Sequence, residues 1–151
     1  MGYISLEECL LDLERSGQLI RIKEEVDPYL EMAAVHLKVH EAQGPALLFE
    51  NVKGSKFRAA SNIFGTLNRS KFIFRDTLPL VHQLMELKND PVKAIKHPFK
   101  NFAAGLAALK ALPYKNPFNK PVLTQQIQIS DIPAIHHWPM DGGAFITLPQ
   151  V

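Results

Sequence analysis

The sequence predicts an α/β fold, because helical and strand-like patterns alternate through its first half. Apolar residues recur at helical spacing over residues 6–13, and an in-out alternation typical of a half-buried strand follows over residues 19–26. Two short apolar segments, residues 46–49 and 57–64, flank a turn and predict a β-hairpin. With 46% hydrophobic and 21% charged residues, the 151-residue chain has the composition of a globular protein with a sizeable core.

The first helix has clear start and stop signals. Ser5 and Glu8 have the spacing of a capping box, and Gly17 is a natural C-terminal stop. Cys9 lies on the apolar side of this helix, so we expect it to be a small core residue rather than a nucleophile. Because Cys9 is the only cysteine of the chain, no intrachain disulfide can form.

A second helix is expected to begin with Asp27 as N-cap and Pro28 in the first helical position, and to end at Gly44-Pro45. After the hairpin, Thr66 is expected to cap a short helix through Phe74. Two further helices are predicted from apolar spacing, one marked by Leu80, Leu84 and Leu87 and the other by Phe102, Leu106 and Leu109.

Proline spacing divides the chain. Three prolines fall within residues 113–121, which predicts a linker between a domain of residues 1–112 and a second one beginning at residue 122. Residues 122–129 have strand composition, and a second strand is expected at 144–148. An apolar strand at the chain end needs partners for its backbone, so we expect this sequence to be an N-terminal piece of a longer protein.

Charge is distributed unevenly although the net charge is only +2. Residues 1–50 carry 4 Lys/Arg against 10 Asp/Glu, whereas residues 51–121 carry 13 against 3. The lysines are scattered and rarely alternate with aromatic residues, so a solvated surface is favoured over a nucleic-acid interface. No apolar run is long enough to span a membrane and no secretory signal is present, which favours a cytoplasmic protein.

Two groups of histidines are the candidate metal ligands. His36 and His40 are four residues apart on the second helix, but Leu37, Lys38 and Val39 between them provide no catalytic glutamate. We therefore expect two exposed or partly buried helix histidines rather than a metal site. No glycine-rich phosphate loop or nucleophile elbow accompanies them.

The second group is His136, His137 and Asp141. Adjacent histidines in an extended chain point to opposite sides, which argues against a shared metal. We expect a shaped loop, in which Asp141 accepts from neighbouring amides, Gly142-Gly143 permits dihedral angles closed to other residues, and Trp138 anchors the loop in a core. Two glycines also let a backbone come close to a ligand, so a supporting role near a cofactor stays open. A small metalloenzyme built on the two histidines and Asp141 stays open as an alternative.

Taken together, these motifs resemble the N-terminal part of the UbiD family of decarboxylases, which includes 3-polyprenyl-4-hydroxybenzoate carboxy-lyases. The resemblance covers essentially the whole chain. Met140 stands where the family usually has Glu, and His137 where it often has Cys. The matching stretches, in the family's order, are residues 5–7, 17–22, 26–31, 44–54, 62–66, 131–133 and 138–147.

The resemblance implies an N-terminal α/β domain followed by the first strands of a truncated split β-barrel that binds flavin. It implies that the intact protein reversibly decarboxylates aromatic or α,β-unsaturated acids, such as a polyprenyl-hydroxybenzoate of ubiquinone biosynthesis. The implied cofactors are prenylated FMN, a divalent metal such as manganese, and potassium. The family's catalytic, metal-binding and cofactor-binding residues match no position of this sequence, so this piece is expected to serve as scaffold within a homo-oligomer.

A second hypothesis remains beside the first. A free-standing interaction domain could use the basic residues of 51–121 to bind an acidic partner or nucleic acid. Such binding would weaken steeply as salt is added.

Overall fold

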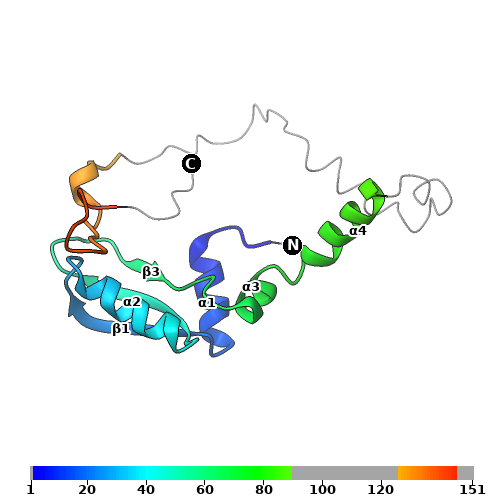
Figure 1. The fold of residues 1–151 in the computed structure, drawn as a ribbon, viewed down its shortest axis with the longest axis horizontal. Coiled ribbons are helices and arrows are strands. Elements are labelled where there is room, and N and C mark those ends of the chain that lie inside the picture. Colours follow the sequence, from blue (N-terminus) through cyan, green and yellow to red (C-terminus); the bar gives the residue numbers. More distant parts are fainter. Residues whose placement is uncertain (1, 90–125, 146–151) are drawn as a thin grey trace. The chain divides into compact units, whose positions relative to one another are not determined.

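The computed structural model describes residues 2–89 and 126–145, and these fall into two compact units. The larger unit comprises residues 3–73 together with 126–145 (Figure 1). Of the other unit, the described part consists of residue 2 and residues 74–89 and contains helix α4 (Leu78–Asn89). No helix in the described part of the chain is both long and apolar enough to cross a membrane.

Helix α1 (Leu6–Arg15) begins and ends where the sequence predicts. The Glu8 amide donates to Ser5 Oγ at 3.2 Å, and the Glu8 carboxylate accepts from the Ile4 amide at 2.7 Å. Gly17 leaves the helix with φ of 71°, a left-handed conformation that glycine adopts without a steric cost. Cys9 is buried, as predicted.

The sheet has three strands in the order β1 (Leu19–Val26), β2 (Ala46–Val52) and β3 (Ala59–Ser61). β1 and β2 run parallel and are connected through helix α2 (Glu31–Glu41), whereas β2 and β3 form the predicted antiparallel hairpin. The strand predicted over residues 57–64 is wrong in length. It ends at Ser61 because Asn62 has φ of 57° and turns the chain out of the ladder.

Strand β2 is buried on both faces, which explains its continuous apolar sequence. Ala46 and Leu48 belong to a core with α1 and helix α3 (Leu67–Ile73). Leu47 and Phe49 belong to a second core with α2, which Ile135 joins from the C-terminal segment. The sheet therefore has helices packed on both faces, and the α/β prediction is confirmed.

The predicted start of the second helix is wrong. Its N-cap is Leu30, with φ of 64°, and not Asp27. Asp27 Oδ1 instead accepts from the Tyr29 amide at 2.9 Å. The chain cannot become helical at Pro28 because its carbonyl accepts from the His136 amide at 3.0 Å, while the Leu30 amide donates to the His136 carbonyl at 3.1 Å. Tyr29 is thus held in a parallel bridge to His136, which is distant in sequence, and the helix begins only after the turn at Leu30.

The two later helices within the described residues, α3 and α4, were predicted. The Arg69 amide donates to Thr66 Oγ1 at 3.2 Å, which confirms Thr66 as the cap of α3. The helix predicted around Leu80 and Leu84 is α4. The helix predicted around residues 102–109 and the linker at 113–121 lie outside the described residues, so the predicted domain boundaries stay a prediction.

The described part of the predicted strand at 122–129 is not a strand. Residues 126–128 join no ladder, and Ile129–Asp131 form a 3-10 turn. The turn is closed because the Asp131 amide donates to the Gln128 carbonyl at 2.9 Å and the Gln128 amide donates back to the Asp131 carboxylate at 3.2 Å. Of the strand predicted at 144–148, the described residues 144 and 145 lie outside any strand, and the rest lies beyond the described part.

Candidate functional site

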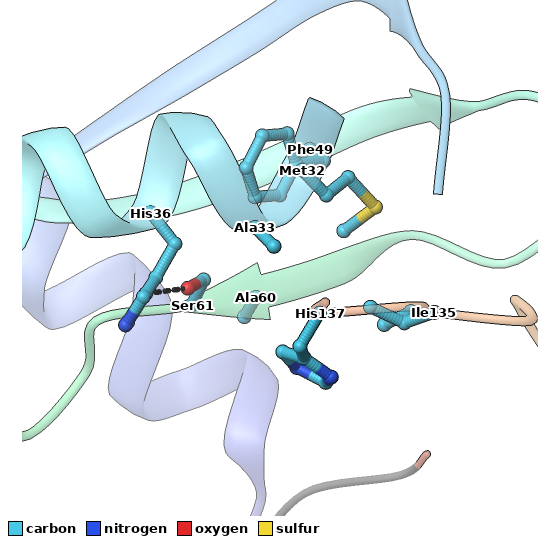
Figure 2. A pocket seen from close by; sticks show the side chains of 8 residues that line it. All are labelled: Met32, Ala33, His36, Phe49, Ala60, Ser61, Ile135 and His137. Carbon is cyan, nitrogen blue, oxygen red and sulfur yellow. Dashed lines mark hydrogen bonds between the residues drawn. The ribbon is translucent and has the colours of Figure 1, made fainter. Parts of the chain in front are cut away.

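A cavity of about 310 Å³ lies where α2, the β2–β3 hairpin and the C-terminal segment meet (Figure 2). Five apolar side chains and three polar ones line it. Helix α2 contributes Met32, Ala33 and His36, the hairpin contributes Phe49, Ala60 and Ser61, and the C-terminal segment contributes Ile135 and His137.

His36 is fixed on the α2 side of this cavity. Its Nδ1 forms a hydrogen bond with Ser61 Oγ on β3 (Figure 2). Its ring is stacked on that of His40, one turn along the helix, with centroids 5.9 Å apart. Burial, and then the proximity of His40 and His137, lowers the pKa of His36 below its usual value. The neutral imidazole is therefore the favoured form of His36 near neutral pH.

His136 and His137 point to opposite sides, as predicted for adjacent residues of an extended chain. The His136 ring lies against Tyr29, with centroids 5.2 Å apart, whereas His137 lines the cavity. Asp141 holds this loop, because its Oδ2 accepts from the His137 amide at 3.0 Å and the Trp138 amide at 2.9 Å. The predicted contact of Asp141 with neighbouring amides is confirmed.

Two other predictions for this loop are wrong. Trp138 is 62% exposed and does not anchor the loop in a core. Neither Gly142 nor Gly143 has φ in the left-handed region, and no heavy atom lies within 4 Å of the Cβ position of either residue. The backbone bonds of residues 136–138 hold the loop instead, so neither a tryptophan anchor nor a glycine conformation is required.

The cavity does not fit a flavin. Its lining includes no lysine or arginine to balance a phosphate. Within residues 2–89 and 126–145, no three His, Cys, Asp or Glu side chains lie close enough together to hold a metal ion. The chemistry available is that of two imidazoles and one hydroxyl on an apolar floor.

The sequence pointed to the histidines but not to their neighbours. His36 and His137 come together across the cavity, whereas His40 Nδ1 lies 3.3 Å from Asn62 Oδ1 and His136 faces Tyr29. Ser61 and Ile135 were not singled out, because nothing in the local sequence shows that β3 and the C-terminal segment meet.

A second polar cluster, around Arg69, fixes the turn that follows β3. Arg69 is only 3% exposed, and its guanidinium donates to three carbonyl oxygens: Nε to Ile63 at 2.9 Å, Nη1 to Gly44 at 3.0 Å and Nη2 to Asn62 at 2.6 Å. The Asn62 amide group donates to the carbonyls of Gly44 and Pro45 at 3.2 and 2.8 Å. These bonds tie the end of α2 to the start of α3, next to Ser61.

Two family models match the chain. The N-terminal domain of 3-octaprenyl-4-hydroxybenzoate carboxy-lyase matches residues 10–88, and the Rift-related domain of the same enzyme matches residues 111–151. The first of these covers just over half of the chain.

Curated relatives agree with this match. An uncharacterized protein of Chlamydia trachomatis is 39% identical over 97% of this chain and 26% of its own length. A 4-hydroxybenzoate decarboxylase subunit from Chlamydia pneumoniae is 36% identical over 89% of this chain and 23% of its own length. The chain thus spans about a quarter of the length of the curated relatives it matches.

Solved structures with local similarity include the vanillic acid decarboxylase of Sedimentibacter hydroxybenzoicus in its open form. It is 36% identical, with 48% of this chain and 16% of that chain covered and a TM-score of 0.45. The UbiD-class enzyme HmfF of Pelotomaculum thermopropionicum, in complex with prFMN, is 38% identical over 40% of this chain and 14% of that one, with a TM-score of 0.38.

Proposed function

The chain belongs to the UbiD family of carboxy-lyases, and from this membership we propose that it is the N-terminal part of a decarboxylase. The enzyme would reversibly remove carbon dioxide from an aromatic or α,β-unsaturated carboxylic acid, such as a polyprenyl-hydroxybenzoate of ubiquinone biosynthesis. The observation that carries the proposal is the match of the family's N-terminal and Rift-related domains, in that order, along one chain.

Within this enzyme we assign a scaffold role to the described residues. Charged groups are mostly engaged in holding the fold: Arg21, for example, donates to the carboxylates of Glu14 and Glu50. The cavity at His36 and His137 has no cation for a flavin phosphate and no carboxylate to return a proton to a product. Prenylated FMN, a divalent metal such as manganese, and potassium would be bound by other parts of a cytoplasmic homo-oligomer.

Three of the cations that the structure describes in residues 51–89 are engaged within the fold. Lys53 pairs with Asp27 and Arg58 with Glu7, each at 2.7 Å. Arg69 is buried among carbonyl oxygens. These three cations are used within the fold, and an acidic partner for residues 51–121 stays a second proposal, which a salt titration of binding would test.

The test has two parts. First, the 151-residue chain is mixed with prenylated FMN and manganese, and bound flavin is measured by absorbance after gel filtration. The scaffold role predicts no retained flavin, and stoichiometric binding would refute it.

Second, the matching segment of the Chlamydia pneumoniae relative is replaced by this chain. The chimera is expected to keep flavin binding and the exchange of labelled carbon dioxide into its acid substrate. A chimera that folds and assembles as the parent does, but has lost flavin binding, would refute the assignment to this enzyme's N-terminal part. Circular dichroism and gel filtration establish folding in both experiments.

A further inference from the structure

Four of the six histidines of the chain gather where the C-terminal segment, residues 131–145, lies on α2 and the hairpin. His36 and His137 line the cavity there, and both are half-buried (Figure 2). The ring of His40 is stacked on that of His36, and His136 directly precedes His137 in the segment. The proposed function gives no role to this histidine cluster.

The charges that act on His36 are those of other histidines. Its Nδ1 bonds to the neutral Ser61 Oγ of β3, and β2 presents the apolar Phe49. The residues that line the cavity include no aspartate or glutamate. Burial, and then the proximity of His40 and His137, lowers the pKa of His36. A proton on His36 therefore meets two groups that become cations as pH falls, and no anion in the cavity lining.

The other polar groups around the cluster do not offset this repulsion. His40 Nδ1 lies 3.3 Å from Asn62 Oδ1, which carries no charge. The acidic group of the loop is Asp141, and its Oδ2 accepts from two backbone amides of that loop at 3.0 and 2.9 Å. The carboxylate of Asp141 is thus engaged in holding the loop.

The segment is attached to the rest of the larger unit by a small number of contacts. His136 exchanges two backbone bonds with Pro28 and Leu30, at 3.0 and 3.1 Å. Ser55 Oγ donates to one carbonyl of the segment at 3.0 Å, and Ile135 packs against the α2 core. The net contribution of each such bond is modest, because water replaces it when it breaks. A change of charge in the cluster is therefore able to shift the balance between a held and a released segment.

We propose that the histidine cluster is a pH-sensitive latch, which holds residues 131–145 on α2 and the hairpin while His36 is neutral and releases them when His36 and His137 are protonated. Because the pKa of His36 is lowered in the held state, the released state binds a proton more readily. Falling pH therefore favours release from about pH 6.5 downwards.

The latch does not depend on the carboxy-lyase assignment. The Rift-related family model matches residues 111–151, which include the segment. The latch would thus control how firmly the described part of this match is held on α2 and the hairpin.

The test measures amide hydrogen exchange in the 151-residue chain between pH 7.5 and pH 5.5. The reporters are the amides of Leu30 and His136, which bond across the interface. Each rate is divided by the intrinsic exchange rate at the same pH, which gives the opening constant. This constant is expected to rise at least about fivefold as pH falls, since one histidine contributes up to about tenfold per pH unit. It should exceed the opening constant of the β2 amides at every pH, because release is local.

Matched variants separate the charge from the packing. His36→Gln keeps a side chain that can bond Ser61 but cannot take up a proton, and it should reduce the rise to less than about twofold. His82→Gln, at an exposed position of α4, is the control and should leave the rise unchanged.

Three results would overturn the proposal. The first is an opening constant of the Leu30 and His136 amides that stays within about twofold between pH 7.5 and pH 5.5. The second is equal opening of these amides and of β2 at every pH, which would mean global unfolding. The third is an equal rise in His36→Gln and the parent. If His36→Gln fails to fold, His137→Gln takes its place, and its rise is expected to be at least about twofold smaller than that of the parent.

Discussion

Replacement of Arg69 by methionine is the sharpest test of how the turn after β3 is held. Methionine keeps the length and apolar stem of the side chain but removes the three donors of the guanidinium. Two of the carbonyls keep another donor: that of Gly44 keeps the Asn62 side-chain amide, and that of Asn62 keeps the Gly65 amide at 3.2 Å. Among the described residues, only the Ile63 carbonyl loses its sole partner.

The expected loss of stability follows from the number of carbonyls that lose a donor. An unsatisfied buried carbonyl costs about 1–3 kcal/mol, and each lost bond from a charged donor that leaves its acceptor partly satisfied costs about 0.5–1.5 kcal/mol. Relief of the charge burial, which lowers the pKa of Arg69, offsets part of this loss. We therefore expect Arg69→Met to lower the free energy of unfolding by about 2–4 kcal/mol.

Urea unfolding followed by circular dichroism measures this change as a shift of the midpoint at constant slope. The matched control is Arg58→Met, which breaks a surface ion pair with Glu7 and should cost less than about 1 kcal/mol. If the two variants are equally stable, or if Arg69→Met lies within about 0.5 kcal/mol of the parent, the role assigned to the guanidinium is refuted.

Two further variants test neighbouring features by the same unfolding assay. Gly65→Ala would place its Cβ 1.8 Å from Asn62 Oδ1, so the buried side-chain amide must move, and we expect the free energy of unfolding to fall by about 1–3 kcal/mol. The control is Gly142→Ala, whose Cβ would have no heavy atom within 4 Å and which should change stability by less than about 0.5 kcal/mol. Equal effects of the two substitutions would contradict the role given to Gly65. For His36, the folded state has the lowered pKa, so the unfolded chain binds a proton first as pH falls. Stability should therefore decline from about pH 7.5 downwards through about 6.5 and below, and His36→Gln should flatten that decline; an unchanged pH profile would show that His36 does not cause it.

Local signals in the sequence were sufficient for much of the fold. The capping pair of Ser5 and Glu8 formed as predicted, because a cap and its amides lie within one helical turn. The continuous apolar run of β2 and the turn after it predicted the hairpin, because the two strands of a hairpin are neighbours in the sequence. The family resemblance also came from short motifs, and the family models confirm it.

Local sequence signals did not predict the start of α2 or the length of β3. Asp27-Pro28 has a good helix-start sequence, yet the pairing of Pro28 and Leu30 with His136 delays the helix to Glu31. Bonds to a distant segment outweighed a local preference of about 1 kcal/mol. The bend at Asn62 is similarly fixed by the carbonyls of Gly44 and Pro45, which directly precede β2, the partner strand of β3.

The sequence alone determined the order of helices and strands from α1 to α4, because periodicity and capping act over a few neighbouring residues, and it determined the family. It did not determine residues 126–129, which were predicted as strand and join no ladder. Only the tertiary structure decided that His36, Ser61 and His137 face one cavity while His40 and His136 face elsewhere. The physical reason is that side chains from three separate segments converge only after the sheet, α2 and the C-terminal segment have packed together.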